Sequence, residues 1–142
     1  MITRLRLGNW RNFADVDVAL APRAFIVGPN GSGKSNLLAA LAFLGGIASR
    51  GSGLSSAQTR VDRPGRPARR MGAKGTDPVS IGVDVLLGKV AWTYDLSFRP
   101  LIAQTKFEPE VIRERVSRDG TILLDRPDEA DRQDPERRGQ TA

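Results

Sequence analysis

The chain has 142 residues, a net charge of +6, and neither cysteine nor histidine. That length suits a single domain with a respectable core. The absence of cysteine excludes a disulfide framework, and the absence of histidine removes the usual general base and the commonest metal ligand, which argues against zinc. No signal peptide is visible and the longest apolar run, Leu37–Leu44, is too short to span a bilayer, so a soluble cytoplasmic protein is predicted.

The first 27 residues predict three strands. Ile2–Leu7 and Asp15–Leu20 each alternate polar and apolar residues, which predicts two half-buried strands, with turns at Gly8-Asn9 and at residues 21–23. The apolar run Ala24–Val27 predicts a third, shorter strand.

Gly28–Ser35 reads GPNGSGKS and fits the phosphate-binding pattern of glycine, four residues, glycine, lysine and serine or threonine without a mismatch. It lies between the predicted strand 24–27 and a predicted helix, Asn36–Ala48, which is the context that this motif requires. The glycines allow successive N–H groups to turn inward and form a nest for phosphate oxygens, aided by the positive end of the helix. The complete match disfavours the alternative of a chance glycine-rich turn.

The motif predicts a site for a nucleoside triphosphate, taken as ATP, together with Mg²⁺. We expect Lys34 to reach the β- and γ-phosphates and the Ser35 hydroxyl to bind the metal, while Pro29 stiffens the entry to the loop. The predicted binding residues are Gly28, Pro29, Asn30, Gly31, Ser32, Gly33, Lys34, Ser35 and Asn36.

The order of segments resembles the amino-terminal lobe of SMC/RecF-like ABC-type ATPases, which are often grouped with AAA-family ATPases. These segments are a strand, Asn9–Phe13, a second strand and the stretch IVGPNGSGKSNLLAALAFL. The resemblance covers residues 1–48 strongly and 79–125 loosely. It implies an α/β fold: a P-loop NTPase lobe with an associated antiparallel β-meander, here an incomplete domain. In that family ATP closes a dimer of two heads, which implies a head-to-head ATPase partner or a carboxy-terminal lobe supplied separately.

The helix 36–48 has almost no polar face, which predicts burial against a sheet, and Gly45-Gly46 predicts that it ends or frays there. Residues 49–76 hold seven basic residues and one acidic residue, and therefore the whole net charge. Because this segment is rich in glycine, serine and proline, we expect a basic flexible insertion. Contact with DNA or RNA and a merely solvated loop both remain open, and the lack of an aromatic residue weakens the nucleic-acid interpretation.

Residues 77–125 predict an antiparallel β-meander. Its expected strands are 79–87, 90–98, 107–116 and 121–124, with turns at Gly88-Lys89 and Asp119-Gly120. Residues 126–142 show no apolar periodicity and predict a disordered or truncated tail.

Hydrolysis requires an acidic motif to complete the Mg²⁺ site. Ile122–Asp125 resembles this motif, because an apolar strand is followed by an aspartate. However, Arg126 stands where the family has its catalytic glutamate, and no LSGGQ-like signature precedes it. The Asp119-Gly120 turn favours a local meander instead. By resemblance, Gln104 falls where a metal- and water-sensing glutamine could lie and Arg11 matches a basic residue near the nucleotide. A surface glutamine and an exposed turn arginine are the plainer interpretations.

The catalytic residues thus stay unknown and enzyme activity stays undecided. One interpretation is the ATP-binding amino-terminal part of an ATPase engaged in DNA maintenance or in defence against foreign DNA. The second is a non-hydrolysing nucleotide-binding module that regulates a partner, and the third is a degenerate fragment without a stable fold.

Overall fold

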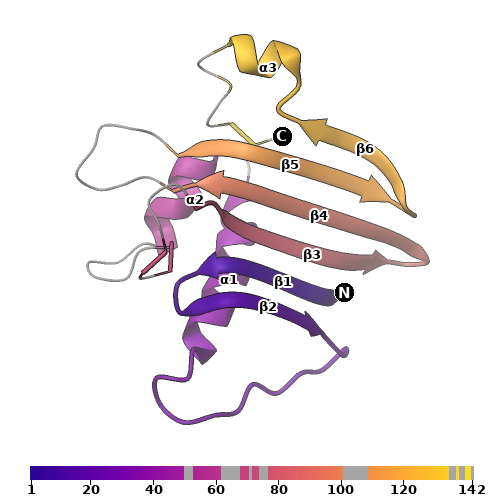
Figure 1. The fold of residues 1–142 in the computed structure, drawn as a ribbon. Coiled ribbons are helices and arrows are strands. Elements are labelled where there is room, and N and C mark those ends of the chain that lie inside the picture. The colour runs from indigo at the N-terminus through magenta and orange to yellow at the C-terminus, as the bar shows by residue number, and fades with distance from the viewer. Residues whose placement is uncertain are drawn as a thin grey trace.

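The computed structural model describes residues 1–49, 53–61, 68–70, 72–73, 77–100, 109–134, 137 and 140–141. These residues form one six-stranded antiparallel sheet with helices against one of its faces (Figure 1). In chain order the elements are β1 (Ile2–Trp10), β2 (Phe13–Ala19), α1 (Lys34–Ile47), α2 (Leu54–Val61), β3 (Val79–Leu87), β4 (Val90–Arg99), β5 (Glu110–Arg118), β6 (Thr121–Arg126) and α3 (Glu129–Gln133).

The strand order is β2-β1-β3-β4-β5-β6, so β1 and β3 join the first hairpin to the four-stranded meander. Leu7 pairs with Ile81 across β1 and β3, and Ile81 pairs with Leu96 across β3 and β4. Because side chains alternate along a strand, these buried residues share the face that α1 and α2 cover. Antiparallel pairing with apolar residues on one face only explains why the sequence alternates so clearly here.

The core is centred on three aromatic rings in contact, of which Phe43 and Phe98 are stacked and Trp10 and Phe43 are tilted by 58°. Phe43 of α1 lies 5.4 Å from the ring of Trp10 and 5.3 Å from the ring of Phe98, measured between ring centroids. All three side chains are fully buried. Phe43 therefore attaches α1 to β1 and β4 at once, and it is the main apolar anchor of the helix that follows the glycine-rich loop.

The opposite face of the sheet is polar and its charges are paired between strands. Arg6 of β1 donates to Asp84 of β3 at 2.8 Å and to Asp95 of β4 at 3.2 Å. The Arg6 guanidinium passes close over Gly82, where an added Cβ would stand 2.3 Å from Asp95 Oδ1 and 2.9 Å from Arg6 Nε. A glycine at this position leaves room for the cross-strand ion pairs.

Two features of the amino-terminal third differ from expectation. The predicted turn at Gly8-Asn9 is wrong: β1 continues to Trp10, and the turn lies at Arg11-Asn12. Gly8 pairs with β2 on one side and with β3 on the other, so the strand continues through it. Asn9 and Arg11 both have a left-handed φ of 51°, and the chain reverses direction after Trp10.

The predicted strand Ala24–Val27 is not formed. Phe25 and Val27 are 89% and 87% exposed, and this stretch pairs with no strand in the part of the chain that the structure describes. An apolar run becomes a strand only where a neighbouring strand supplies hydrogen bonds, and none does so here.

Segment 49–76 is not wholly irregular, so the prediction that it does not fold is wrong for residues 54–61. These form α2, whose Leu54, Ala57 and Val61 are buried. Gly45-Gly46 does not end the first helix either, because Gly46 is the close-contact point with α2.

Among the strands of the meander, β3 and β4 match the predicted ranges almost residue for residue, with the turn at Gly88-Lys89. The third runs from Glu110 to Arg118, and its expected start at Phe107 falls outside the described residues. How the chain divides into domains stays a prediction.

The tail differs from the disordered end that its composition predicts, because residues 129–133 form α3. Asp128 and Asp131 make a reciprocal capping box at its start, and Arg126 donates to Asp131 at 3.0 Å. No helix in the described part of the chain is long and apolar enough to cross a membrane.

Candidate functional site

The glycine-rich loop Gly28–Ser35 leads directly into α1, which begins at Lys34. Gly31 and Gly33 have φ values of 84° and 103°, a left-handed conformation that residues with a side chain rarely adopt. Two of the glycines of the motif are therefore needed for the path of the backbone.

Lys34 lies across the inside of this loop. Its ammonium group donates to the carbonyl oxygens of Gly28 at 2.6 Å and Pro29 at 2.7 Å. The loop thus curves around its own lysine, and in the described residues no carboxylate pairs with this cation. A positive charge held by neutral carbonyls is available to an anion that enters the loop.

The start of α1 has the features of an anion site. Gly33 is the N-cap residue, no side chain caps the helix, and no acidic residue stands in its first turn. The first N–H groups of a helix have no partner within the helix, and its positive end attracts negative charge. Together with Lys34 and the left-handed glycines, these N–H groups fit a phosphate chain. Ser35 is exposed at the same place, which suits its predicted role toward Mg²⁺.

The β1–β2 turn, residues 10–13, holds the first turn of α1. Three consecutive residues bond Asn36: Trp10 Nε1 donates to its carbonyl oxygen at 2.8 Å, Arg11 Nη1 donates to its Oδ1 at 3.1 Å, and Asn12 Oδ1 accepts from its Nδ2 at 2.8 Å. Asn36 follows Ser35 immediately, so the turn fixes the end of the phosphate-binding motif.

The same turn also closes over Gly33. A Cβ atom at this position would stand 2.6 Å from Asn12 Nδ2 and 2.7 Å from the Phe13 ring. Trp10, Asn12 and Phe13 are the positioning residues that sequence reasoning missed. The resemblance at Asn9–Phe13 pointed to this stretch, but no local pattern reveals a contact across more than 20 residues.

Arg11, expected near the nucleotide by resemblance, has two partners beside the loop. Besides Asn36, its guanidinium donates to the carbonyl oxygen of Val61, the last residue of α2, and lies 5.7 Å from the centre of the Trp10 ring. The exposed-turn interpretation is wrong for this residue, since its side chain is part-buried between α1 and α2.

Asp125, the one candidate for the acidic motif, lies elsewhere. It belongs to β6, which pairs with β5 as the Asp119-Gly120 turn predicted, and Arg113 and Arg115 bond its carboxylate at 3.0 and 2.6 Å. These arginines hold the pKa of Asp125 well below its ordinary range. From β1 to β6 the sheet crosses four strand spacings, about 19 Å, so Asp125 does not reach the loop.

Arg126, at the position of the family's catalytic glutamate, pairs with Asp131. Gln104 lies outside the described residues, as do Arg50, Arg63, Arg66 and Lys74 of the basic segment.

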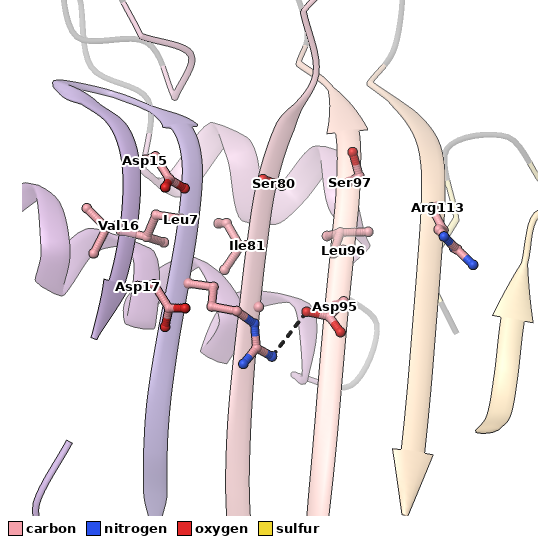
Figure 2. Close-up of a pocket in the computed structure, with 12 residues that line it drawn as sticks. Leu7, Asp15, Val16, Asp17, Ser80, Ile81, Asp95, Leu96, Ser97 and Arg113 are labelled. Carbon is pink, nitrogen blue, oxygen red and sulfur yellow. Dashed lines mark hydrogen bonds and ion pairs between the residues drawn. The ribbon is translucent and has the colours of Figure 1, made fainter. Parts of the chain in front are cut away.

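A shallow hollow of about 320 Å³ lies on the polar face of the sheet, away from the glycine-rich loop (Figure 2). Figure 2 shows Asp15, Asp17, Asp95 and Arg113 around it, with the ion pair to Asp95 drawn. Because Arg6 is engaged by Asp84 and Asp95, its pKa is raised, and we interpret this hollow as part of the sheet's ion-pair network.

Known proteins resemble this chain over two different extents. The family model described as "AAA domain, putative AbiEii toxin, Type IV TA system" matches residues 23–141. Proteins named DNA replication and repair protein RecF are similar over a shorter stretch: 51% identity over 45 residues in Erwinia tasmaniensis, 48% over 50 in Clavibacter michiganensis, and 48% over 44 in Brucella abortus. These matches cover 31%, 34% and 30% of this chain, and each spans 12% of the relative.

Proposed function

The chain belongs to the AAA domain family whose model matches residues 23–141, and from this membership together with the shape of the loop we propose that residues 28–36 bind Mg²⁺-ATP. The observation that carries the proposal is the position of Lys34, whose ammonium group lies inside a loop of left-handed glycines at an uncapped helix start. This combination of a cation, a helix start without a side-chain cap and a backbone nest is what a triphosphate chain requires.

Each residue has a role in the proposal. Lys34 exchanges its two carbonyl partners for β- and γ-phosphate oxygens, and the N–H groups at residues 31–35 bind the remaining oxygens. The Ser35 hydroxyl binds Mg²⁺, which supplies charge neutralisation to the phosphates when it is present. Gly28, Pro29, Asn30 and Ser32 shape the loop, and Asn36 anchors it to the β1–β2 turn.

We further propose that the chain works as the P-loop lobe of a RecF/SMC-type ATPase in the cytoplasm, linked to DNA maintenance or defence. The support is the similarity to proteins named DNA replication and repair protein RecF, together with the family match. A head-to-head ATPase partner or a carboxy-terminal lobe then supplies the groups for hydrolysis, and the basic segment 49–76 is the candidate for a DNA contact.

A second candidate function is nucleotide binding without hydrolysis by this polypeptide. It is favoured by the placement of Asp125, which is neutralised by two arginines on the far side of the sheet from the β1–β2 turn. In this alternative the bound state of the loop regulates a partner.

Calorimetric titration with Mg²⁺-ATP, with phosphate release followed in the same samples, tests both. We expect the wild type to bind and Lys34→Ala to lose most of its affinity. Lys89→Ala is the matched control, because Lys89 lies in the β3–β4 turn and not in the loop. Phosphate release by the chain alone would reject the second candidate, and equal binding by wild type and Lys34→Ala would reject the site itself.

A further inference from the structure

The β1–β2 turn contacts a second element besides the start of α1. Its backbone pairs with residues 68–70: Arg11 N donates to Ala68 O at 2.7 Å, and Arg70 N donates to Asn9 O at 2.7 Å. Val61, the last residue of α2, is also attached to the turn, because its carbonyl oxygen accepts a hydrogen bond from the Arg11 side chain.

The Arg11 side chain joins the start of α1 to the end of α2. One nitrogen of its guanidinium bonds Asn36 Oδ1 and another bonds the Val61 carbonyl. A guanidinium is planar and its donors have fixed relative directions, so the two acceptors cannot move independently without losing a bond. Val61 ends α2, and the negative end of that helix favours a cation at this point.

α2 approaches α1 closely at Gly46. A Cβ atom at Gly46 would stand 3.2 Å from Ala57 Cβ, which leaves no room for a larger side chain. A helix of eight residues is not stable by itself, so α2 exists through its packing on α1 and the turn. Its docked state is consequently a local equilibrium that other contacts can shift.

We propose that docked α2 holds the phosphate loop in its binding conformation through Arg11 and Asn36, so that displacement of α2 weakens nucleotide binding and nucleotide binding strengthens the docking of α2. Arg11 and Asn36 are positioning residues in this scheme. The reciprocity is thermodynamic, because a coupling between two sites acts equally in both directions. The inference rests on the proposed function for its ligand, Mg²⁺-ATP.

The test compares Gly46→Leu with Gly45→Leu. Gly46 is buried against Ala57, whereas Gly45 is exposed and a Cβ there would meet nothing within 4 Å, so the two variants alter helix propensity equally and differ in α2 docking. Amide hydrogen exchange is measured on the nucleotide-free proteins, and Mg²⁺-ATP affinity is measured by calorimetry. We expect Gly46→Leu to speed exchange in α2, in residues 10–13 and in residues 31–36, to leave β4 and β5 protected, and to weaken Mg²⁺-ATP binding roughly 5- to 150-fold.

Gly45→Leu should not speed exchange in α2, in residues 10–13 or in residues 31–36, and should leave the Mg²⁺-ATP affinity unchanged. Faster exchange in α2 with unchanged exchange in residues 31–36 would overturn the coupling. If the wild type does not bind Mg²⁺-ATP, the proposed function fails, whereas the exchange comparison still decides the coupling.

Should Gly46→Leu not fold, Arg11→Lys replaces it, with Arg4→Lys on the polar face as its control. Lysine keeps the charge but cannot hold both acceptors in the same way. Faster exchange in α2 and in residues 31–36 together is expected for Arg11→Lys only, and equal exchange in the two lysine variants would contradict the proposal.

Discussion

Single residues fix the shape of the glycine-rich loop. Gly33 combines a left-handed φ of 103° with a position directly under the β1–β2 turn, so a side chain is excluded by conformation and by space. Lys34 bonds the first two carbonyl groups of the loop, and Asn36 is bonded by three consecutive residues of the turn. The loop is thus held from within and from outside.

Gly33→Ala should lower the free energy of unfolding by about 1–3 kcal/mol, the usual cost of a non-glycine residue in a sparsely populated conformation. The contact with Asn12 and Phe13 adds to that cost and displaces the loop. Urea denaturation measures the change. Gly45→Ala is the control, and because Gly45 is helical and open, we expect it to stabilise the protein by about 0.4–1 kcal/mol. Equal stability of Gly33→Ala and wild type would contradict the assigned loop geometry.

At the scale of elements, α1 is attached to the sheet chiefly by Phe43, which contacts the rings of Trp10 and Phe98. Phe43→Ala should cost about 3–5 kcal/mol of stability, as is usual for a buried phenylalanine. Leu38→Ala, on the same helix but 54% exposed, should cost far less. Denaturation curves of the two variants give the comparison. If Leu38→Ala were as damaging as Phe43→Ala, α1 would pack on the sheet through a different face.

Cross-strand ion pairs make the stability of the sheet depend on pH. The hydrogen bonds from Arg6 are the largest cause of a lowered pKa at Asp84, opposed in part by burial. A carboxyl group whose folded pKa lies below its unfolded value stabilises the fold above that unfolded value, about 3.9, and this contribution is lost as the pH falls further. We therefore expect the free energy of unfolding to fall steeply below about pH 4.

In Asp84→Asn the free energy of unfolding should fall less steeply with decreasing pH, as measured by urea denaturation between acid and neutral pH. Asp15→Asn is its control, since Asp15 is exposed and makes no ion pair within the described residues. If the free energy of unfolding fell equally steeply at acid pH in Asp84→Asn and in the wild type, the ion pairs of Arg6 would not cause the pH dependence.

Local sequence patterns were sufficient for most strands and for the glycine-rich loop. The alternation at residues 79–87 and 90–98 and the Gly88-Lys89 and Asp119-Gly120 turns give these strands almost their full extent, because antiparallel neighbours impose a period of two. The failures are tertiary in origin. Residues 24–27 need a neighbouring strand in order to form one. α2 packs on α1 where Gly46 lets Ala57 approach, and no local pattern reveals this contact.

The whole molecule places its proposed nucleotide site at one end of the fold. The β1–β2 turn, the start of α1 and the end of α2 meet there, while β6 forms the far edge of the sheet and α3 follows it (Figure 1). The ammonium group of Lys34 lies at this end of the molecule. The hairpin turn connects the loop to the sheet, and of its residues the resemblance placed only Arg11 near the nucleotide.

Backbone amide resonances recorded during titration with Mg²⁺-ATP test the location of the site most directly. We expect large shifts for Gly31, Gly33, Lys34 and Ser35, smaller ones in residues 10–13, and unchanged resonances in β5 and β6. The same titration of Lys34→Ala should show none of the large shifts. Shifts centred on the polar face around Arg6, or equal shifts in both proteins, would contradict the assignment of Gly28–Asn36 as the nucleotide site.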